Sequence, residues 1–418
     1  MKQRTAAMFL AVLMLLGLMG CGGGSDETET IEPPPVEEPE PTPEPEPEPE
    51  PEPVGPSGMN PLTGVPMEEE FENDRPVAVM FNNLKAAQPQ LGVSQADIIY
   101  EIPAEGGITR MVGVFQSLDG VGNLGSIRST RSYYLEVALG HDALLVHAGG
   151  SPEAYQDIPN WGVDNMDGVR GGSDAQIFWR DAARKKTAGY EHSLLTSGAN
   201  IQEYLAGGRY RTEHKDGYTY TQAFAEEGTP ANGTAVESFK LYYTAYKTGT
   251  FDYDADTGLY MVGQYGGPYT DGNSGDQVGV TNVLVLETDI NVIPGDKEGR
   301  LNVEMTGSGN GTYFCGGKCV SIQWSKADRN SQFVYRLTDG SPLTLGQISI
   351  VRLERDSQLL IPVFDYCMPE KDCSCGTRCS CTEDPCAIFR NISFPVGEFF
   401  PPNTVQIDDY ESTRHNAH

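Results

Sequence analysis

The sequence predicts an α+β protein, with an α/β N-terminal domain followed by a mostly β C-terminal domain. Two observations indicate this. The chain of 418 residues contains 48 Gly and 29 Pro, which favours turns, linkers and β structure over long helices. Short runs rich in β-branched and apolar residues recur along the whole chain, whereas helical apolar spacing is confined to its first half.

Residues 1–20 have the pattern of a secretion signal. Lys2 and Arg4 precede an apolar run from Met8 to Leu18, which is short for a membrane span. The run ends in Leu-Met-Gly-Cys, which resembles a bacterial lipobox, so we expect cleavage before Cys21 and transfer of diacylglycerol to its thiol. Two acyl chains (palmitate, for example) suffice for stable anchoring. The alternative is a plain cleaved signal in which Cys21 falls by chance.

Residues 21–59 read as the lipidated cysteine followed by a disordered linker. A Glu-Pro repeat runs from Glu44 to Pro53, and twelve acidic residues lie between Asp26 and Glu52. Proline at alternate positions prevents helix and sheet pairing, and like charges extend the chain. We expect a spacer between the membrane and the globular part, with a ligand for a proline-binding module as the alternative.

The charge balance limits the class of partner. The chain has 29 Lys and Arg against 59 Asp and Glu, a net charge of −30. Without Lys2, Arg4 and the acidic linker, 27 basic and 47 acidic residues remain, so the body is acidic in its own right. Such a surface disfavours nucleic acid and anionic lipid headgroups.

Residues 60–206 carry the α/β pattern of the first domain. The order of its central elements is strand, strand, helix, strand. These are expected at Asp97 to Ile102, Arg110 to Phe115, Ser132 to Leu139 and Ala143 to His147. A further buried strand is expected at Arg75 to Phe81, and Ser151 before Pro152 indicates the start of another helix.

Polar residues gather at the turns of this central unit and form the candidate ligand site. They are Glu101, Glu105, Arg110, Arg128, Arg131, Tyr134, His147, Ser151 and, further along, His192. Arg128 and Arg131 are three residues apart; if a helix begins there, both lie on one face and suit a carboxylate or phosphate. The alternative is that the arginines pair internally with Glu101 and Glu105, because an ion-pair network uses the same residues.

Several of these segments resemble a known family. The stretches ADIIYEIPAEGGITR, GSIRSTRSYYLE and LLVHAGGSPEAY, together with NPLTGVP from Asn60, are similar to the YerB-like bacterial lipoproteins, a family of unknown function. FDYDADTGLY, VGVTNVLVLETDI and SIQWSKAD resemble its C-terminal domain, so the likeness covers roughly Asn60 to Ile350. The resemblance implies a two-domain envelope lipoprotein and no established chemistry.

An envelope hydrolase that uses Glu105 and His147 is the alternative to a binding protein. No G-x-S-x-G elbow, H-E-x-x-H pattern or phosphate loop occurs, and Ser151 reads as a helix cap. For His147 and His192 a structural role, bonded to a loop carbonyl, is the simpler interpretation. We therefore expect a binding or scaffold protein near the cell wall, with no cofactor and no metal.

Residues 207–233 are polar and Gly-rich and read as a connection, and 234–362 as the β-rich second domain. Asp252, Asp254 and Asp256 alternate, which is typical of calcium loops. The sixth position, however, is Thr257 instead of Gly, and the twelfth is Gly263 instead of Glu. A hairpin turn is therefore the preferred interpretation.

Of nine cysteines, eight remain once Cys21 is set aside. Residues 363–390 form a Cys-rich segment, and 391–418 a C-terminal tail. A short exported segment dense in cysteine predicts disulfides; a zinc or copper thiolate site is the alternative. The disulfide candidates are Cys315, Cys319, Cys367, Cys373, Cys375, Cys379, Cys381 and Cys386.

The sequence thus predicts a protein anchored outside the cytoplasm to the bacterial cell membrane. Its expected partners are the lipid bilayer, through Cys21, and a cell-wall component or another envelope protein. Nucleic acid is not an expected partner.

Overall fold

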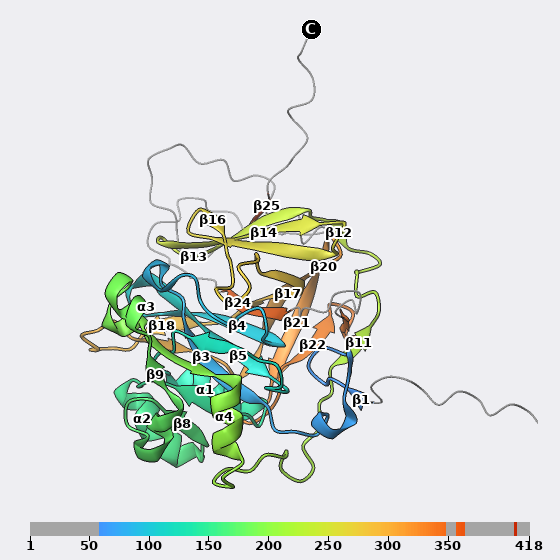
Figure 1. Cartoon of the computed structure of the whole chain (residues 1–418). Helices are drawn as coiled ribbons and strands as arrows, with labels where there is room; N and C mark the ends of the chain where they lie inside the picture. Colours follow the sequence, from blue (N-terminus) through green and yellow to red (C-terminus); the bar gives the residue numbers. More distant parts are fainter. Residues whose placement is uncertain (1–57, 348–356, 364–404, 408–418) are drawn as a thin grey trace, which may run out of the picture. The chain divides into compact units, whose positions relative to one another are not determined.

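A computed structural model describes residues 58–347, 357–363 and 405–407, and strands outnumber helices in it (Figure 1). The first part of the described chain, from residue 58 on, contains four α-helices and several short 3-10 turns, among them η3 (Glu105–Gly107) and η5 (Tyr190–His192). The helices are α1 (Ser132–Gly140), α2 (Pro152–Trp161), α3 (Ala182–Thr187) and α4 (Gly198–Leu205). Its strands are β1 (Gly58–Met59), β2 (Pro66–Met67), β3 (Val77–Asn82), β4 (Ile98–Ala104), β5 (Ile108–Phe115), β6 (Asn123–Gly125), β7 (Leu144–His147), β8 (Asn165–Asp167), β9 (Trp179–Arg180) and β10 (Leu194–Ser197).

The second part contains strands and no α-helix among the described residues. Its longer strands are β13 (Ser238–Thr244), β14 (Lys247–Asp254), β15 (Leu259–Gln264), β17 (Gly279–Glu287), β20 (Gly307–Cys315), β21 (Lys318–Lys326), β22 (Val334–Leu337) and β24 (Ser357–Val363). Its shorter strands are β11 (Ala223–Ala225), β12 (Thr234–Ala235), β16 (Gly267–Pro268), β18 (Ile290–Val292), β19 (Leu301–Val303), β23 (Thr344–Gly346) and β25 (Val405–Ile407).

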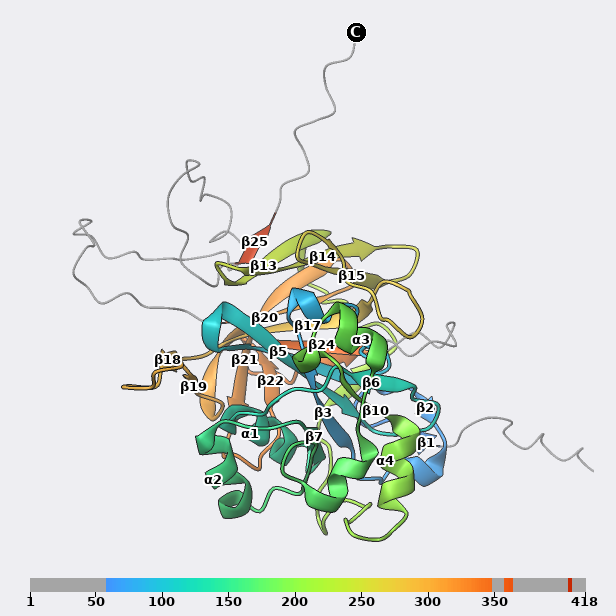
Figure 2. The same cartoon turned by 60° about the vertical axis from the view of Figure 1, so that its left-hand side comes forward.

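One continuous sheet joins the two parts of the chain. Its strand order is β25-β13-β14-β15-β17-β24-β4-β5-β3-β7-β8, with β20, β21 and β22 attached through β17. Strand β24 lies between β17 and β4 and is parallel to both. In Figures 1 and 2 the helices α1, α2 and α4 lie toward one end of this arrangement, and β13 and β14 lie at the other.

Strand β3 shows that the sheet is covered on both faces. Val77, Val79 and Phe81 belong to one apolar cluster, whereas Ala78 and Met80 belong to another on the opposite face. Because successive side chains of a strand point to opposite faces, a run of six buried residues is what a strand with both faces covered requires. The prediction of a buried strand in this stretch is therefore confirmed.

The predicted central unit is present as β4, β5, α1 and β7, and Ser151 caps α2, where its hydroxyl accepts a hydrogen bond from the Ala154 amide. The α/β expectation for this part is met only in part. Strands β3, β7 and β8 run parallel, but β4, β5 and β3 pair antiparallel, and strands dominate. The mostly β character of the second part is confirmed, including the hairpin turn between Asp254 and Leu259.

The parallel strands β3, β7 and β8 determine where loops converge. Their carboxyl ends lie at one edge of the sheet, where the backbone continues to the loops after Asn82, His147 and Asp167. Such an edge is where ligands bind in open sheets with parallel strands. No helix within the described ranges is long and apolar enough to cross a membrane.

Several predictions concern residues outside the described ranges. These are the signal and Cys21, the Glu-Pro linker, and most of the Cys-rich segment with its six cysteines. They stay predictions.

Candidate functional site

The candidate residues do not share one pocket; they lie in two buried clusters, one open pocket and several isolated positions. The position of helix α1 separates Arg128 from Arg131. Its first residue is Ser132, so Arg131 is the N-cap and Arg128 lies in the loop before the helix. The two arginines therefore do not lie on one face of a helix, which was the condition for both to hold the same ligand group.

The first buried cluster, called the Glu105 cluster, consists of Glu105, Arg110 and Arg131. Arg110 Nη2 lies 3.1 Å from Glu105 Oε1, and Arg131 Nε lies 3.1 Å from Oε2, with a second contact from Arg131 Nη2. Burial alone would raise the pKa of Glu105, but the Arg131 hydrogen bond and the two positive charges outweigh it and lower that pKa. The alternative of an internal ion-pair network thus describes these three residues.

The second buried cluster, called the Glu101 cluster, joins the two parts of the chain. Glu101 Oε1 accepts hydrogen bonds from Asn83 Nδ2 at 2.8 Å and Thr109 Oγ1 at 2.6 Å. From the second part, Tyr243 donates its hydroxyl proton to Oε2 at 3.1 Å, and Lys247 Nζ lies 3.2 Å from Oε1. Each partner supplies a donor, so the carboxylate is satisfied without water.

Lys247 was missed by sequence reasoning although a signal was present. In β14 the buried positions are Lys247, Gly249 and Phe251, which alternate with more exposed residues. The strand period of two therefore places Lys247 on the core face. Its side chain is 2% exposed. Burial lowers its pKa, and the nearby Glu101 carboxylate opposes that shift.

The remaining candidates have structural partners. His147 is fully buried; Nδ1 lies 2.8 Å from the Gly149 carbonyl, and Nε2 lies 3.0 Å from Asn165 Oδ1. His192 Nδ1 lies 2.8 Å from Asn82 Nδ2. Tyr134 donates to the Ile102 carbonyl at 2.9 Å. Because both ring nitrogens of His147 have partners and Glu105 is held by two arginines, nothing in this geometry supports the hydrolase alternative.

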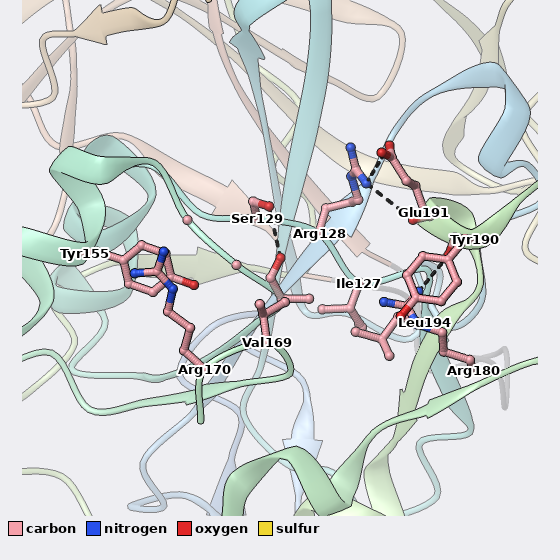
Figure 3. A pocket seen from close by; sticks show the side chains of 13 residues that line it. Ile127, Arg128, Ser129, Tyr155, Val169, Arg170, Arg180, Tyr190, Glu191 and Leu194 are labelled. Atoms are coloured by element: carbon pink, nitrogen blue, oxygen red, sulfur yellow. Dashed lines mark hydrogen bonds and ion pairs between the residues drawn. The ribbon is translucent and has the colours of Figure 1, made fainter. Parts of the chain in front are cut away.

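The open pocket lies at the carboxyl ends of β3, β7 and β8 and has a volume of about 350 Å³ (Figure 3). We call it the arginine pocket, because three arginines line it in a strongly acidic chain. It is lined by Ile127, Arg128, Ser129, Ala148, Gly149, Gly150, Tyr155, Val169, Arg170, Arg180, Tyr190, Glu191 and Leu194.

Hydrogen bonds hold the loop after β7, which forms one wall of the arginine pocket. The Thr130 amide donates to the Gly149 carbonyl at 3.0 Å, and the Gly149 amide donates to Asp167 Oδ1 at 2.8 Å. Gly149 has φ +85°, and a Cβ there would lie 3.0 Å from Ser129 Oγ. Glycine is therefore required at this position.

Each arginine of the pocket has a different environment. Arg128 Nη1 lies 3.3 Å from a carboxylate oxygen of Glu191, whose side chain is 72% exposed. Arg170 stacks on Tyr155, with Cζ 3.8 Å from the ring centre. Arg180 stacks on Tyr190 at 3.6 Å, and its Nη1 donates to the Tyr190 carbonyl at 2.6 Å.

Within the part of the chain that the structure describes, neither Arg170 nor Arg180 pairs with a carboxylate. Apolar side chains are also exposed at this pocket: Val169 is 61% exposed and Tyr190 is 58% exposed. Sequence reasoning identified Arg128 but missed the two stacked arginines. Their stacking partners are 15 and 10 residues away in sequence, on other elements, and no sequence period relates them.

A second cavity of about 300 Å³ lies between α1, α2 and the β18–β19 hairpin. Its lining includes Glu136, Glu153, Asp157, Trp161 and Arg300. Burial raises the pKa of Glu136 to about 7, with the Lys326 charge opposing the shift. One oxygen each of Glu136 and Glu153 is buried without a hydrogen-bond partner among the described residues.

Cys315 and Cys319 lie on the β20–β21 hairpin. Cys319 is opposite Phe314, and Cys315 is opposite Lys318. Because 314 and 315 point to opposite faces, the two thiols are buried on opposite sides of the sheet and do not bond to each other. In the described ranges no three His, Cys, Asp or Glu side chains are placed to hold a metal ion.

Comparisons with known proteins identify the family. The N-terminal domain model described as "Protein of unknown function (DUF3048)" matches residues 62–211, and the corresponding C-terminal domain model matches 239–347. "Putative lipoprotein YerB" of Bacillus subtilis (strain 168) is 31% identical over 273 residues, which cover 64% of this chain and 78% of that protein. "Exosporium protein A" of Clostridium sporogenes (strain ATCC 15579) is 28% identical over 107 residues, 25% of this chain and 30% of that protein.

The crystal structure of YerB protein from Bacillus subtilis has a similar fold. The TM-score is 0.61 at 27% sequence identity, and the match covers 72% of this chain and 96% of that structure. The likeness stated from the sequence motifs is therefore confirmed. The chain is a homologue of YerB and belongs to the DUF3048 family, which has an N-terminal and a C-terminal domain and no known function.

Proposed function

We propose that this chain is a lipid-anchored extracytoplasmic protein that binds an anionic ligand in the arginine pocket near the cell wall. The anchor is supported by the Leu-Met-Gly-Cys motif that ends at Cys21, and by the name of the Bacillus subtilis homologue, "Putative lipoprotein YerB". The binding role is supported by the pocket.

The observation that carries the binding role is that Arg170 and Arg180 have no carboxylate partner among the residues that the structure describes. In a chain of net charge −30, guanidinium groups have many internal carboxylates available. Arg110 and Arg131 use one, but Arg170 and Arg180 do not within the described ranges. An unpaired guanidinium beside exposed apolar side chains suits an anion with an apolar body.

The location agrees with this role. The pocket lies beyond the carboxyl ends of parallel strands, where open sheets place ligands. Its volume of about 350 Å³ falls at the lower end of small-molecule sites, so it suits a compact ligand or one segment of a polymer.

Calorimetric titration with octanoate and octanamide tests the proposal, because these probes share an apolar chain and differ in charge. We expect the parent to bind octanoate more tightly. The triple variant Arg128→Ala/Arg170→Ala/Arg180→Ala should lose this preference, whereas Arg336→Ala, an exposed arginine outside the pocket, should keep it. Equal binding of the two probes by the parent would refute the proposed function.

The anchor is tested separately by changing Cys21→Ala. We expect loss of lipid labelling and release of the protein from membranes, because the thiol is the acceptor of the lipid in such motifs. Retention of the unlabelled variant in the membrane fraction would contradict this part of the proposal.

A further inference from the structure

Two cationic stacks lie at opposite sides of the arginine pocket. Figure 3 shows Arg170 with Tyr155 on one side and Arg180 with Tyr190 on the other, with Ile127 and Val169 between them. Tyr155 comes from α2 and Arg170 from the loop after β8. Arg180 belongs to β9 and Tyr190 to η5. The two stacks are therefore built from unrelated parts of the fold.

Stacking determines how each guanidinium can meet a ligand. The ring covers one face of the planar group, at 3.8 Å for Arg170 and 3.6 Å for Arg180. The N–H donors lie in the plane and stay directed outward at the edge, where they match the two oxygens of a carboxylate or phosphate. Arg180 uses Nη1 on the Tyr190 and Ser193 oxygens, and Nε and Nη2 have no protein acceptor in the described ranges.

Arg128 differs from these two because Glu191 already supplies a carboxylate oxygen 3.3 Å from Nη1. Two of the three cations are therefore available for a ligand. Between them the pocket offers the apolar side chains of Ile127, Val169 and Leu194 and the backbone of Gly149 and Gly150, none of which carries a charge.

From this arrangement we propose that the pocket selects a ligand with two anionic groups at the ends of a neutral body, one for Arg170 and one for Arg180. The inference rests on the proposed function and names its ligand class. A segment with two carboxylates or one with two phosphates has this chemistry. Occupying both stacks at once makes the second contact intramolecular, which raises affinity without any new type of contact.

The test is calorimetric titration with dicarboxylates of increasing length, namely hexanedioate, octanedioate and decanedioate, at one fixed ionic strength. Octanoate is the reference with a single charge. We expect an optimum within the series, and the best dicarboxylate should bind about tenfold or more tightly than octanoate. A non-specific attraction between charges gives no such optimum, since it does not require the two ends to fit.

Single variants show which residues cause the gain in affinity of the best dicarboxylate over octanoate. Arg170→Ala and Arg180→Ala should each reduce the affinity for the best dicarboxylate to the level of octanoate, whereas octanoate binding should change by about twofold or less, because one stack remains. Arg336→Ala is the matched control and should preserve the gain. The alkane bisphosphate of the optimal length, compared with the dicarboxylate, distinguishes phosphate from carboxylate as the preferred group.

The outcomes separate the two proposals. If octanoate binds better than octanamide but no dicarboxylate exceeds octanoate, the pocket takes one anion and this inference is wrong while the proposed function stands. The same conclusion follows if both single variants keep the full gain. If octanoate and octanamide bind equally, the proposed function fails and this inference fails with it.

Discussion

Arg128 and Arg131 lie three residues apart, yet they belong to regions of opposite character. Arg131 is 7% exposed and is held by Glu105 in the Glu105 cluster. Arg128 lines the arginine pocket, and its partner Glu191 is mostly exposed. The comparison shows that a guanidinium is held in the interior when its carboxylate partner is largely buried, and lies at the wall of a pocket when that partner is exposed. Mutation should distinguish the two regions, because a buried charge left without its partner is costly and an exposed one is not.

The largest effect is expected at the Glu101 cluster. Lys247→Met would leave the Glu101 carboxylate buried without its cation and should lower the free energy of unfolding by about 3–5 kcal/mol. Urea unfolding measures this loss. The double variant Glu101→Gln/Lys247→Met removes both charges and should recover much of the stability. If Lys247→Met were as stable as the parent, the Glu101 cluster would not hold the two parts of the chain together.

The next largest effect is expected at Arg131, with Arg128 as the matched control on the same loop. Arg131→Ala should cost about 2–4 kcal/mol, less than Lys247→Met, because Glu105 keeps its contact with Arg110. Arg128→Ala should cost less than about 1 kcal/mol, since its pair is exposed. Equal losses of unfolding free energy in the two variants, measured by urea unfolding, would contradict the distinction between the Glu105 cluster and the arginine pocket.

The next prediction concerns Glu136, a largely buried carboxyl group that forms no ion pair with an arginine in the described ranges. Its pKa rises from 4.5 toward about 7 on folding, so the folded state holds the proton more tightly than the unfolded chain. Stability contributed by the protonated form is therefore lost as the pH rises from about 4.5 to about 7. Glu136→Gln should raise the urea midpoint relative to the parent at pH 8 and change it little at pH 4. A constant difference across this range would show that the carboxyl does not titrate there.

An effect on stability as small as that of Arg128→Ala is expected at Arg170. Its stack on Tyr155 is exposed, so Arg170→Ala should cost about 0.5–1 kcal/mol. The free energy of unfolding from urea denaturation checks this value. A loss as large as that of Arg131→Ala would mean that Arg170 supports the fold, and the pocket would lose one of its two available cations.

The local structure followed from the sequence because it depends on short-range patterns. Alternation and apolar runs predicted β3, β4, β5 and β7, and helical spacing predicted α1. Ser151 before Pro152 predicted the start of α2, because a cap and a fixed φ act within one turn. The family resemblance was also present in the sequence, in motifs such as ADIIYEIPAEGGITR.

The tertiary structure alone decided which charges are buried together. Glu101 and Lys247 are 146 residues apart, and they meet because their faces of β4 and β14, which carry Ile99 and Phe251, border one shared apolar cluster. Glu105 and Arg131 were foreseen as either a site or a network, and only the path of the loop before α1 settled that they form a network. Arg170 follows the parallel strand β8, whereas Arg180 lies on β9, which pairs antiparallel with β10 in a separate sheet, and only the tertiary structure brings both to one pocket. Which charged groups form an ion pair depends on the distance between them and on their burial, and neither follows from their spacing along the chain.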